Sequence, residues 1–545
     1  MKRLKFKILL LFAIIFPMLL FFQSCIDDIK DFENIRNIKM GDWKPEIAVP
    51  LIHAELSIFD FVKGVNYDSL YHVGNDNMVS LIYKGSSYSA YAKDYINIPN
   101  QNFSTGPFNY HTSGLDSILL LKDIEFDSTM THDYSFNNNE EIKKIIFKDG
   151  ILEIDIESTF ARSGEIRVEI PSLKRVNGDP FFELILFTYN GQGKVTVNKQ
   201  IDLDSFSLDL TKQNTTFNAF KVHYNILMFG TSNFVHKNDR VKVEIKFKDV
   251  DFSYIQGYLG QHKFNYHSDT THINLFESTE VGEIHFENPH YNIYVYNTVG
   301  IPITLKNPVI KSYSETQGVA TLTGSAVDNP VYINYPSISN PGKIAKTGIY
   351  MNKTNSNIQD LIRYAPGKMS SDFTLQSNQG GVTYNNFATD SSHFDVKTEL
   401  ELPLYGYTND WEVFLDTDFE IENIDQIESL LFNLLVINGF PVEADVQLYF
   451  IDSTDNVFDS LIHTNDYVFR SGVVGANYRV EEPSVNLTVI EFDKARLDNL
   501  SLVRKIRVRA NLSTTNSGNT NIKIYSDYIF DIKLSLKTKM KVDVL

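Results

Sequence analysis

Apolar and polar residues alternate one by one along much of this chain, and this period of two is the feature that most narrows its fold. Successive side chains of a β-strand point to opposite faces, so an alternating segment buries one face and exposes the other to water. The alternation is clearest in six segments: 152–157, 165–170, 241–247, 399–402, 506–509 and 532–537. It predicts antiparallel sheets packed as sandwiches or barrels.

Helical patterns, by contrast, are few and short. One covers 356–365, with Ser356 as its N-cap and Pro366 behind its end, and another covers 57–64. Residues 515–519 have the Asn, Ser and Gly composition of a turn, and they predict a hairpin between the last two alternating segments. We therefore expect a mainly β fold, made of tandem antiparallel β-sandwich-like domains with a few short helices.

A short motif recurs in the chain. Segments 295–303 and 436–442 both pass from β-forming residues through Asn and a turn to Pro, and 176–181 is a weaker third copy. Asn and Gly tolerate the backbone of a tight turn, and Pro is acceptable where a strand begins. The resemblance among the copies is either chance or the mark of tandem modules of related fold.

The size and composition of the chain predict several packed cores. Apolar residues make up 43% and aromatic residues 13% of the 545 positions, which is enough for globular domains. The single cysteine allows no disulfide, so the domains depend on burial. A chain of this length is expected to form about two to four domains. We predict an N-terminal β domain, a middle β domain and a C-terminal β-sandwich domain, at 41–260, 261–400 and 401–545.

The N-terminus has the pattern of an export signal. Four basic residues precede the apolar run 8–22, which is too short to span a bilayer. Gln23 and Ser24 then lead directly to Cys25, the only cysteine in the chain. These residues resemble a lipoprotein signal peptide at 1–24, in which Cys25 becomes the acylated first residue of the mature protein. The alternative is an ordinary secretory signal that ends beside a cysteine.

An acidic tether, expected at 25–40, follows the lipidation site. Asp27 and Asp28 stand close behind Cys25 and resemble the signal that exports lipoproteins of Bacteroidota to the cell surface; the alternative is a plain solvated linker. Segments 41–51 and 438–452 are similar to uncharacterised surface-exposed lipoproteins of the same phylum. This resemblance implies a lipid-anchored outer-membrane protein, exposed on the cell surface, and implies no activity.

The charge of the chain excludes one class of partner. The formal net charge of −18 becomes −22 once the signal is removed, because the signal contains four basic and no acidic residues. Such a surface repels phosphate backbones, so we expect no nucleic-acid partner. The membrane, reached through the N-terminal lipid, is the expected partner, and an outer-membrane protein complex or a glycan is a further candidate.

No pattern of catalytic or metal-binding residues stands out. Five histidines lie close together in the sequence: His262, His267, His272, His285 and His290. The first three are spaced by five, which along one strand puts successive side chains on opposite faces, so we favour solvated histidines over a zinc site. Residues 452–456 with Asp459 look like a calcium loop but lack its central Gly and closing Glu, and a plain turn is the alternative. There is no Gly-x-Ser-x-Gly. We predict no cofactor, no metal and no enzymatic activity. The alternative is a glycoside hydrolase with a pair of catalytic carboxylates, although the sequence singles out no such pair.

A pattern of Asp followed by a hydroxyl residue recurs along the chain and resembles the O-glycosylation acceptor motif of exported Bacteroidota proteins. Asp-Ser and Asp-Thr are also common in turns. The candidate acceptors are Ser69, Ser117, Ser128, Thr270, Ser453 and Ser460.

These observations predict a non-enzymatic, lipid-anchored surface protein that acts as a binding or assembly accessory. One alternative is a surface glycan-binding protein of a polysaccharide uptake system. Since Trp43 and Trp411 are the only tryptophans, its sugar platform would rely on Tyr. Another alternative is a lipid-binding carrier.

Overall fold

The computed structural model of the protein describes residues 46–62, 69–267, 270–276, 279–315, 317–418, 427–460, 469–500 and 502–540. Strands make up 60% and helices 6% of the structure, and the sheets are antiparallel. The prediction of a mainly β fold with sandwich-like domains and a few short helices is confirmed.

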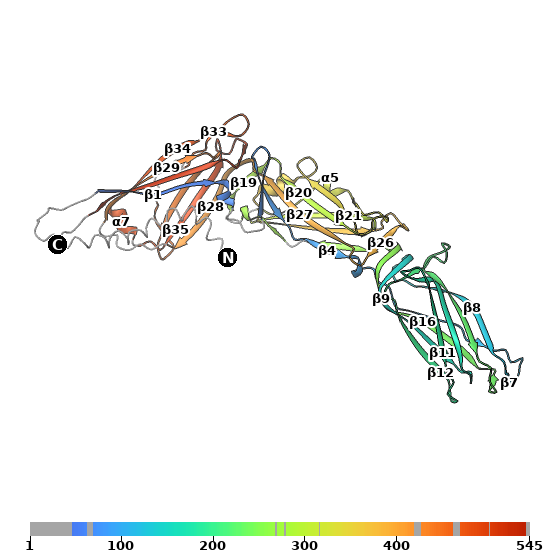
Figure 1. Ribbon diagram of the computed structural model, residues 1–545. Helices are drawn as coiled ribbons and strands as arrows, with labels where there is room; N and C mark the ends of the chain where they lie inside the picture. Colours follow the sequence, from blue (N-terminus) through green and yellow to red (C-terminus); the bar gives the residue numbers. More distant parts are fainter. Residues whose placement is uncertain are drawn as a thin grey trace, which may run out of the picture.

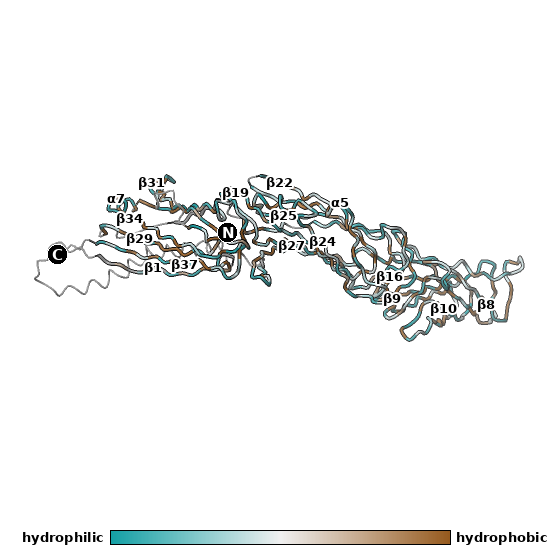
Figure 2. The backbone as a smooth tube through the Cα atoms, turned by 90° about the horizontal axis from the view of Figure 1, so that it is seen from above, coloured by the Kyte–Doolittle hydropathy of each residue, from teal (hydrophilic) through white to brown (hydrophobic). Residues whose placement is uncertain are grey.

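The strands form three β-sandwiches that follow one another in a row (Figure 1). Figure 2 shows the same row from above. We call the sandwich that contains both the first and the last described strands the proximal sandwich. The middle sandwich follows it, and the distal sandwich lies at the far end of the row.

The proximal sandwich packs two sheets against each other. The first sheet has the order β1 (Glu46–Ser57), β37 (Ile529–Met540), β29 (Ile427–Asn438) and β34 (Ser484–Phe492). The second has the order β19 (Thr279–Phe286), β28 (Tyr405–Asp418), β35 (Lys505–Thr514), β30 (Val442–Ile451) and β31 (Val457–Ser460), with β36 (Ile522–Lys523) beside β28. A small hairpin and two helices complete it: β32 (Val473–Val474), β33 (Val480–Glu482), α4 (Ile58–Val62) and α7 (Lys494–Leu500).

The middle sandwich has the same two-layer plan. Its first sheet has the order β2 (Ser69–Val73), β3 (Val79–Lys84), β27 (His393–Pro403), β20 (His290–Asn297) and β24 (Ala345–Met351), with β4 (Tyr88–Tyr91) beside β27. Its second has the order β17 (Lys263–His267), β25 (Lys368–Ser377), β21 (Ile303–Ser314) and β22 (Gly318–Thr321), with β18 (Thr271–His272) and β23 (Val331–Ile333) at its sides. The helices are α5 (Ser325–Asp328), α6 (Ile358–Arg363) and two 3-10 turns, η3 (Ala92–Asp94) and η4 (Asn274–Phe276).

The distal sandwich is built around two long strands, β9 (Glu141–Ser158) and β16 (Arg240–Tyr258). Its sheet runs in the order β26 (Asn386–Thr389), β16, β9, β13 (Phe206–Asp209), β10 (Gly164–Arg175), β14 (Ala219–Met228) and β8 (Ile124–Asp133). The side strands are β5 (Gln101–Ser104), β6 (Phe108–Asn109), β11 (Pro180–Phe187) and β12 (Val195–Asp202). A separate hairpin at the end of the row pairs β7 (Ser117–Leu119) with β15 (Phe234–His236).

The chain runs outward along the row and then returns. The strands of segment 41–260, expected as one N-terminal β domain, are distributed over all three sandwiches: β1 is proximal, β2 to β4 are middle, and β5 to β16 are distal. From β17 on the chain returns mainly through the middle sandwich, but β19 lies in the second proximal sheet and β26 in the distal sheet, and from β28 on the strands belong to the proximal sandwich. β1 and β37 pair along their length, so the first and last described strands lie side by side.

Alternation explains why these segments are strands. The clearest predicted strand lies in β16, where every second side chain points into the distal core and is completely buried: Val241, Val243, Ile245 and Phe247. Between them, Lys242, Glu244 and Lys246 point outward. Burial of the apolar row is the main force that stabilises such a strand.

A strand shared between two sandwiches joins the middle and distal ones. β26 comes from the middle part of the chain and pairs with β16 of the distal sandwich. Gly300 and Phe387 exchange two backbone hydrogen bonds there, of 3.0 and 3.1 Å. A Cβ at Gly300 would lie 2.1 Å from the buried Phe387 ring, so only glycine permits this approach. The junction is therefore packed rather than a free linker.

The recurring motif forms the same turn in each copy. The side-chain oxygen of Asn297 accepts a hydrogen bond from the Val299 amide at 2.8 Å, and that of Asn438 accepts one from the Phe440 amide at 2.8 Å. Both asparagines are buried, and each is the last residue of a strand, after which the chain crosses to the opposite sheet. Asn177, in the weaker copy, accepts from the amide two residues ahead at 3.1 Å. The middle and proximal sandwiches are therefore alike at this crossing.

Two local predictions need correction. Residues 515–519 do turn, but the strands on either side do not form a hairpin: β35 pairs with β28 and β30, while β37 pairs with β1 and β29. The turn leads from β35 to β36, which lies beside β28 in the same sheet, and only then does the chain cross to β37 in the other sheet. The two predicted helices are present as α6 and α4, but the N-cap of α6 is Asn357 rather than Ser356.

Candidate carbohydrate-binding face

Aromatic side chains gather on the outer face of the first sheet of the middle sandwich. On β20, alternation turns Ile293 and Val295 into the core, where both are buried. The same alternation turns Tyr294 and Tyr296 outward, where each is half-buried. The two tyrosines therefore stand one behind the other on a central strand, with paired strands on both sides.

Side chains from β24 and β27 frame these tyrosines. Tyr350 of β24 is 55% exposed, and its ring centroid lies 6.1 Å from that of Tyr294 in an edge-to-face arrangement. The Tyr350 ring lies across Gly348, because a Cβ there would come within 2.3 Å of the Tyr350 hydroxyl. The ammonium of Lys346 lies 4.6 Å from the Tyr294 centroid, and that of Lys397 lies 5.4 Å from the Tyr296 centroid. We call the set of Tyr294, Tyr296, Tyr350, Lys346 and Lys397 the tyrosine face.

The surroundings of the face raise the pKa of one of its phenols. Burial, and after it the negative charge of Glu399, raises the pKa of Tyr294. Its phenol is therefore a hydrogen-bond donor at neutral pH. Asp395 of β27 faces Tyr296 across the strand pair and accepts a hydrogen bond from Ser89 at 2.6 Å. Carboxylates and ammonium groups thus stand around the aromatic rings.

Exposed tyrosines continue past the β24 edge. Asn334 fastens the segment after β23 to this edge, since its amide donates to Thr347 Oγ1 and its side-chain nitrogen donates to the Lys346 carbonyl, both at 2.8 Å. On either side of Asn334, Tyr332 and Tyr335 are exposed to solvent. A ligand lying across β24 would therefore meet aromatic rings on both sides of the strand.

Such a surface can hold a sugar chain. The apolar C–H face of a pyranose ring packs against an aromatic ring, and charged and hydroxyl groups at the rim exchange hydrogen bonds with the sugar hydroxyls. The ammonium groups of Lys346 and Lys397 lie over the rings. Both lysine side chains are exposed, so a ligand can push them aside and reach the rings. Sequence reasoning missed this face, although Tyr at 294 and 296 within an alternating segment was the available signal.

The residues predicted for export lie elsewhere. Cys25, Asp27 and Asp28 are outside the described residues. Within the described ranges, no helix is both long and apolar enough to cross a membrane.

The candidate glycosylation sites differ in accessibility. Thr270 and Ser453 are exposed outside regular strands, as an acceptor requires. Ser117, Ser128 and Ser460 are half-buried within β7, β8 and β31, and Ser69 lies in β2. The first two positions therefore suit modification best.

The five neighbouring histidines do not converge. His262 bonds the Leu259 carbonyl at 2.9 Å, His267 contacts Asp372, and His285 stacks on Tyr407. His272 and His290 belong to strands of opposite sheets of the middle sandwich. The structure thus separates the histidines that the sequence places together.

The segment that resembles a calcium loop is folded as a turn. One carboxylate oxygen of Asp452 accepts hydrogen bonds from the Thr454 amide at 2.7 Å, the Thr454 hydroxyl at 2.7 Å and the Asn456 amide at 3.0 Å. These bonds, the Thr454 hydroxyl first, lower the pKa of Asp452. Asp459 instead pairs with Arg496 at 3.1 Å.

Among the described residues, strand pairing brings together a cluster of potential metal ligands that sequence reasoning missed. His53 and Glu55 of β1 meet Asp531 of β37, with 3.0 Å between His53 Nε2 and an Asp531 oxygen. Lys533 Nζ lies 3.0 Å from the other Asp531 oxygen, so a cation already occupies part of this carboxylate. The cluster borders an open, charged hollow of about 420 Å³. We interpret it as an ion-pair network.

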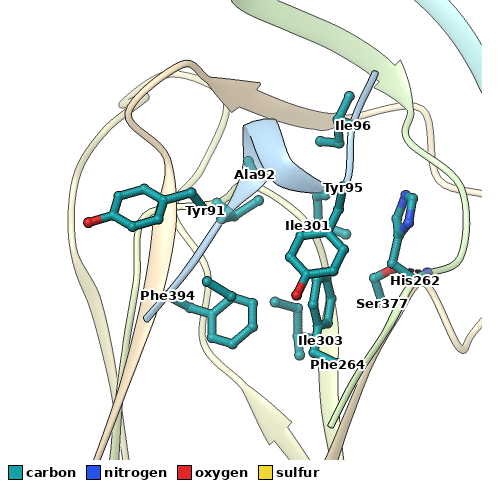
Figure 3. Close-up of a pocket in the computed structure, with 12 residues that line it drawn as sticks. Tyr91, Ala92, Tyr95, Ile96, His262, Phe264, Ile301, Ile303, Ser377 and Phe394 are labelled. Atoms are coloured by element: carbon teal, nitrogen blue, oxygen red, sulfur yellow. Dashed lines mark hydrogen bonds between the residues drawn. The ribbon is translucent and has the colours of Figure 1, made fainter. Parts of the chain in front are cut away.

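A small cavity lies inside the middle sandwich beside the distal junction (Figure 3). Apolar side chains such as Tyr95, Phe264 and Phe394 line it. Its volume of about 20 Å³ is room for about one water molecule. Neither this cavity nor the open hollow has the enclosed apolar volume that an acyl chain needs.

Comparisons with known proteins give no family. No family model matches the chain, and no curated protein matches it. Among solved structures, a Parabacteroides distasonis protein assigned as secreted shares 13% identity at a TM-score of 0.26, covering 52% of this chain and 82% of its own. The tandem CBM22 domains of a Paenibacillus barcinonensis protein share 9% identity at a TM-score of 0.14, covering 56% of this chain and 99% of their own. A structure of infectious bursal disease virus shares 7% identity at a TM-score of 0.14, covering 88% of this chain and 82% of its own. At such scores these likenesses carry no argument about fold or function.

Proposed function

We propose that this chain is a non-enzymatic, lipid-anchored protein of the outer-membrane surface that binds glycans through the tyrosine face. The observation that carries the proposal is the pair Tyr294 and Tyr296 on a central strand, framed by Tyr350, Lys346 and Lys397. The signal-like N-terminus and Cys25 supply the anchor.

The composition of the face favours a sugar over the other ligand classes. A protein interface of this kind is usually depleted in lysine at its centre, whereas two lysines lie over these rings. A lipid carrier needs an enclosed apolar volume, and the hollows described above are too small or too charged. A neutral sugar chain needs flat rings and hydrogen-bonding rims, which the face offers.

The path of the chain supports display away from the membrane. β1, the first described strand after Cys25 in the sequence, belongs to the proximal sandwich, and the middle sandwich lies beyond it in the row (Figure 1). A lipid on Cys25 would hold the proximal sandwich nearest the bilayer and leave the tyrosine face free on the side of the row.

A retention assay on polysaccharides tests the proposal. The mature protein should be retained by affinity gels containing a set of soluble neutral polysaccharides, and replacing Tyr294 and Tyr296 with Ala should weaken binding roughly tenfold per ring. Tyr313→Ala is the matched control: Tyr313 also has a lysine, Lys368, 5.5 Å from its ring, but it lies on the opposite sheet. Retention of none of the polysaccharides, or equal loss in the control, would contradict the proposal.

An assembly role is the second candidate, and the edge strand β34 favours it. Among the described residues β34 pairs only with β29, and three of its outward side chains are more than half exposed: Val485, Leu487 and Val489. An exposed apolar edge accepts a further strand from a partner protein. Leu487→Lys should then reduce the size of the complex extracted in mild detergent and leave glycan retention unchanged.

A further inference from the structure

The far end of the distal sandwich carries a group of large apolar side chains in solvent. β7 and β15 pair there so that Leu119 lies opposite Phe234, and these side chains are 54% and 53% exposed. Leu121 is 69% exposed two residues after Leu119, and Phe229 is 39% exposed at the end of β14. We call these four residues the apolar tip; β7 marks its position in Figure 1.

A buried arginine holds the backbone of the tip. The Arg162 side chain is almost completely buried, and its guanidinium donates hydrogen bonds only to backbone carbonyls. The acceptors belong to the segments that carry the tip: Leu120, Lys122 at 3.0 Å, Phe229 at 3.5 Å and Asn233 at 3.4 Å. One side chain thus ties both segments together, and the apolar side chains stand on a fixed frame.

The two segments of the tip also touch directly. The Gly230 amide donates to Asp123 at 2.7 Å, and a Cβ at Gly230 would lie 2.2 Å from the Leu121 carbonyl oxygen. Glycine is therefore required for this approach of the two backbones. As a result, Leu121 and Phe229 are held on neighbouring backbone segments at this end of the sandwich.

The tip is neutral although the chain as a whole is strongly acidic. Segments 115–123 and 229–239 contain three Asp and two Lys, and Arg162 behind them completes the balance. Asp116 pairs with Lys237 at 2.6 Å, and Asp239 accepts from the His236 amide at 2.7 Å. Its acidic groups are thus engaged within the tip, which lowers the cost of contact with an apolar phase.

The size of the tip decides which apolar phase fits. Four partly exposed Leu and Phe side chains offer on the order of 300 Å² of apolar surface, well below the roughly 800 Å² that each partner contributes to a stable protein interface. Tip-to-tip contact with a second copy would therefore be too small. A bilayer needs no shape complementarity, and Leu and Phe are side chains that enter its interfacial region.

We propose that the apolar tip inserts into the surface of a lipid bilayer with neutral headgroups, at the end of the protein opposite to the N-terminal anchor. The site is independent of the tyrosine face. A rod with a lipid at one end and an inserting tip at the other contacts two membranes, or two regions of one.

Vesicle flotation tests the proposal on the mature chain from residue 26, which keeps every described strand and lacks the lipidated cysteine. The probe is phosphatidylcholine vesicles. The protein should float with them at both low and high salt, because insertion is apolar. The double variant Leu121→Ser with Phe234→Ser should bind at least about tenfold more weakly. A matched double variant, Val319→Ser with Ile344→Ser, removes two side chains of the middle sandwich that are 58% and 62% exposed, and it should float like the unchanged protein.

A second measurement does not depend on whether the serine variants fold. Phe234→Trp places a fluorophore at the tip, and lipids brominated on their acyl chains should quench its emission. Absence of flotation, equal loss in the control variant, or no quenching at 234 overturns the proposal. Concentration-dependent self-association that the tip variant abolishes, without vesicle binding, would instead assign the tip to a second copy.

Discussion

Arg162→Met removes a side chain that bonds both segments of the apolar tip to the connection between β9 and β10, while it keeps most of the buried volume. Its guanidinium donates to the Leu120 and Lys122 carbonyls, the latter at 3.0 Å, and its hydrogen bonds to the Phe229 and Asn233 carbonyls are longer. No carboxylate bonds the guanidinium among the described residues, and its Nε has no partner there. The arginine therefore acts as a donor to backbone oxygens and not as part of an ion pair.

The magnitude follows from these contacts. A hydrogen bond from a charged donor contributes about 1.5–3 kcal/mol, so the bonds to the Leu120 and Lys122 carbonyls together contribute roughly 3–6 kcal/mol. Removal of the arginine also removes the free-energy cost of burying its charge, and this gain offsets part of the lost stability. Burial is costly here, as shown by the lowered pKa of Arg162. We expect a net loss of about 3 kcal/mol, confined to the tip and the strand ends it joins.

Hydrogen exchange measured by mass spectrometry is the appropriate assay, because three sandwiches in one chain need not unfold in a single step. A loss of about 3 kcal/mol should speed exchange roughly 150-fold in peptides covering 115–123 and 229–239, with little change in the proximal sandwich. Arg167→Met is the control, since Arg167 is half exposed and pairs only with Glu165 at 3.3 Å. Unchanged exchange at the tip of the Arg162 variant would refute the reasoning.

Three further predictions concern the anchor, the export signal and acid stability. Cys25→Ala should yield unlipidated protein that leaves the detergent phase in phase partitioning; unchanged partitioning would contradict the anchor. Replacing Asp27 and Asp28 with Ala should reduce labelling by an external protease on intact cells while total lipoprotein stays constant, and equal labelling would make these residues a plain tether. The pKa of Glu153 is lowered to about 2, chiefly by a hydrogen bond from Lys248 and further by bonds from other donors, while burial acts in the opposite direction. Because the folded pKa lies below the unfolded one, this carboxylate contributes stability above about pH 4.5 that is lost as the pH falls toward 2. Urea midpoints of the protein and of Glu153→Gln should therefore converge between pH 4.5 and 2, and parallel curves would exclude this role.

Local chemistry made much of the fold predictable. The alternating segments are all strands, since the period of side-chain burial is a property of a few consecutive residues: 241–247 lies in β16, 152–157 in β9 and 165–170 in β10. The shortness of the helices could be predicted for the same reason. The recurring Asn motif was visible because a side chain that bonds the amide two residues ahead needs no distant partner.

Only the tertiary structure decided which strands pair and what meets on their outer faces. β1 lies beside β37 although almost the whole chain separates them, and this pairing alone brings His53 to Asp531. The tyrosine face likewise needs β24 and β27 on either side of β20. A strand has two edges that bond any neighbour, so alternation shows which side chains are buried but not beside which strand. Partner choice depends on burying all three cores together, and that is a property of the whole chain.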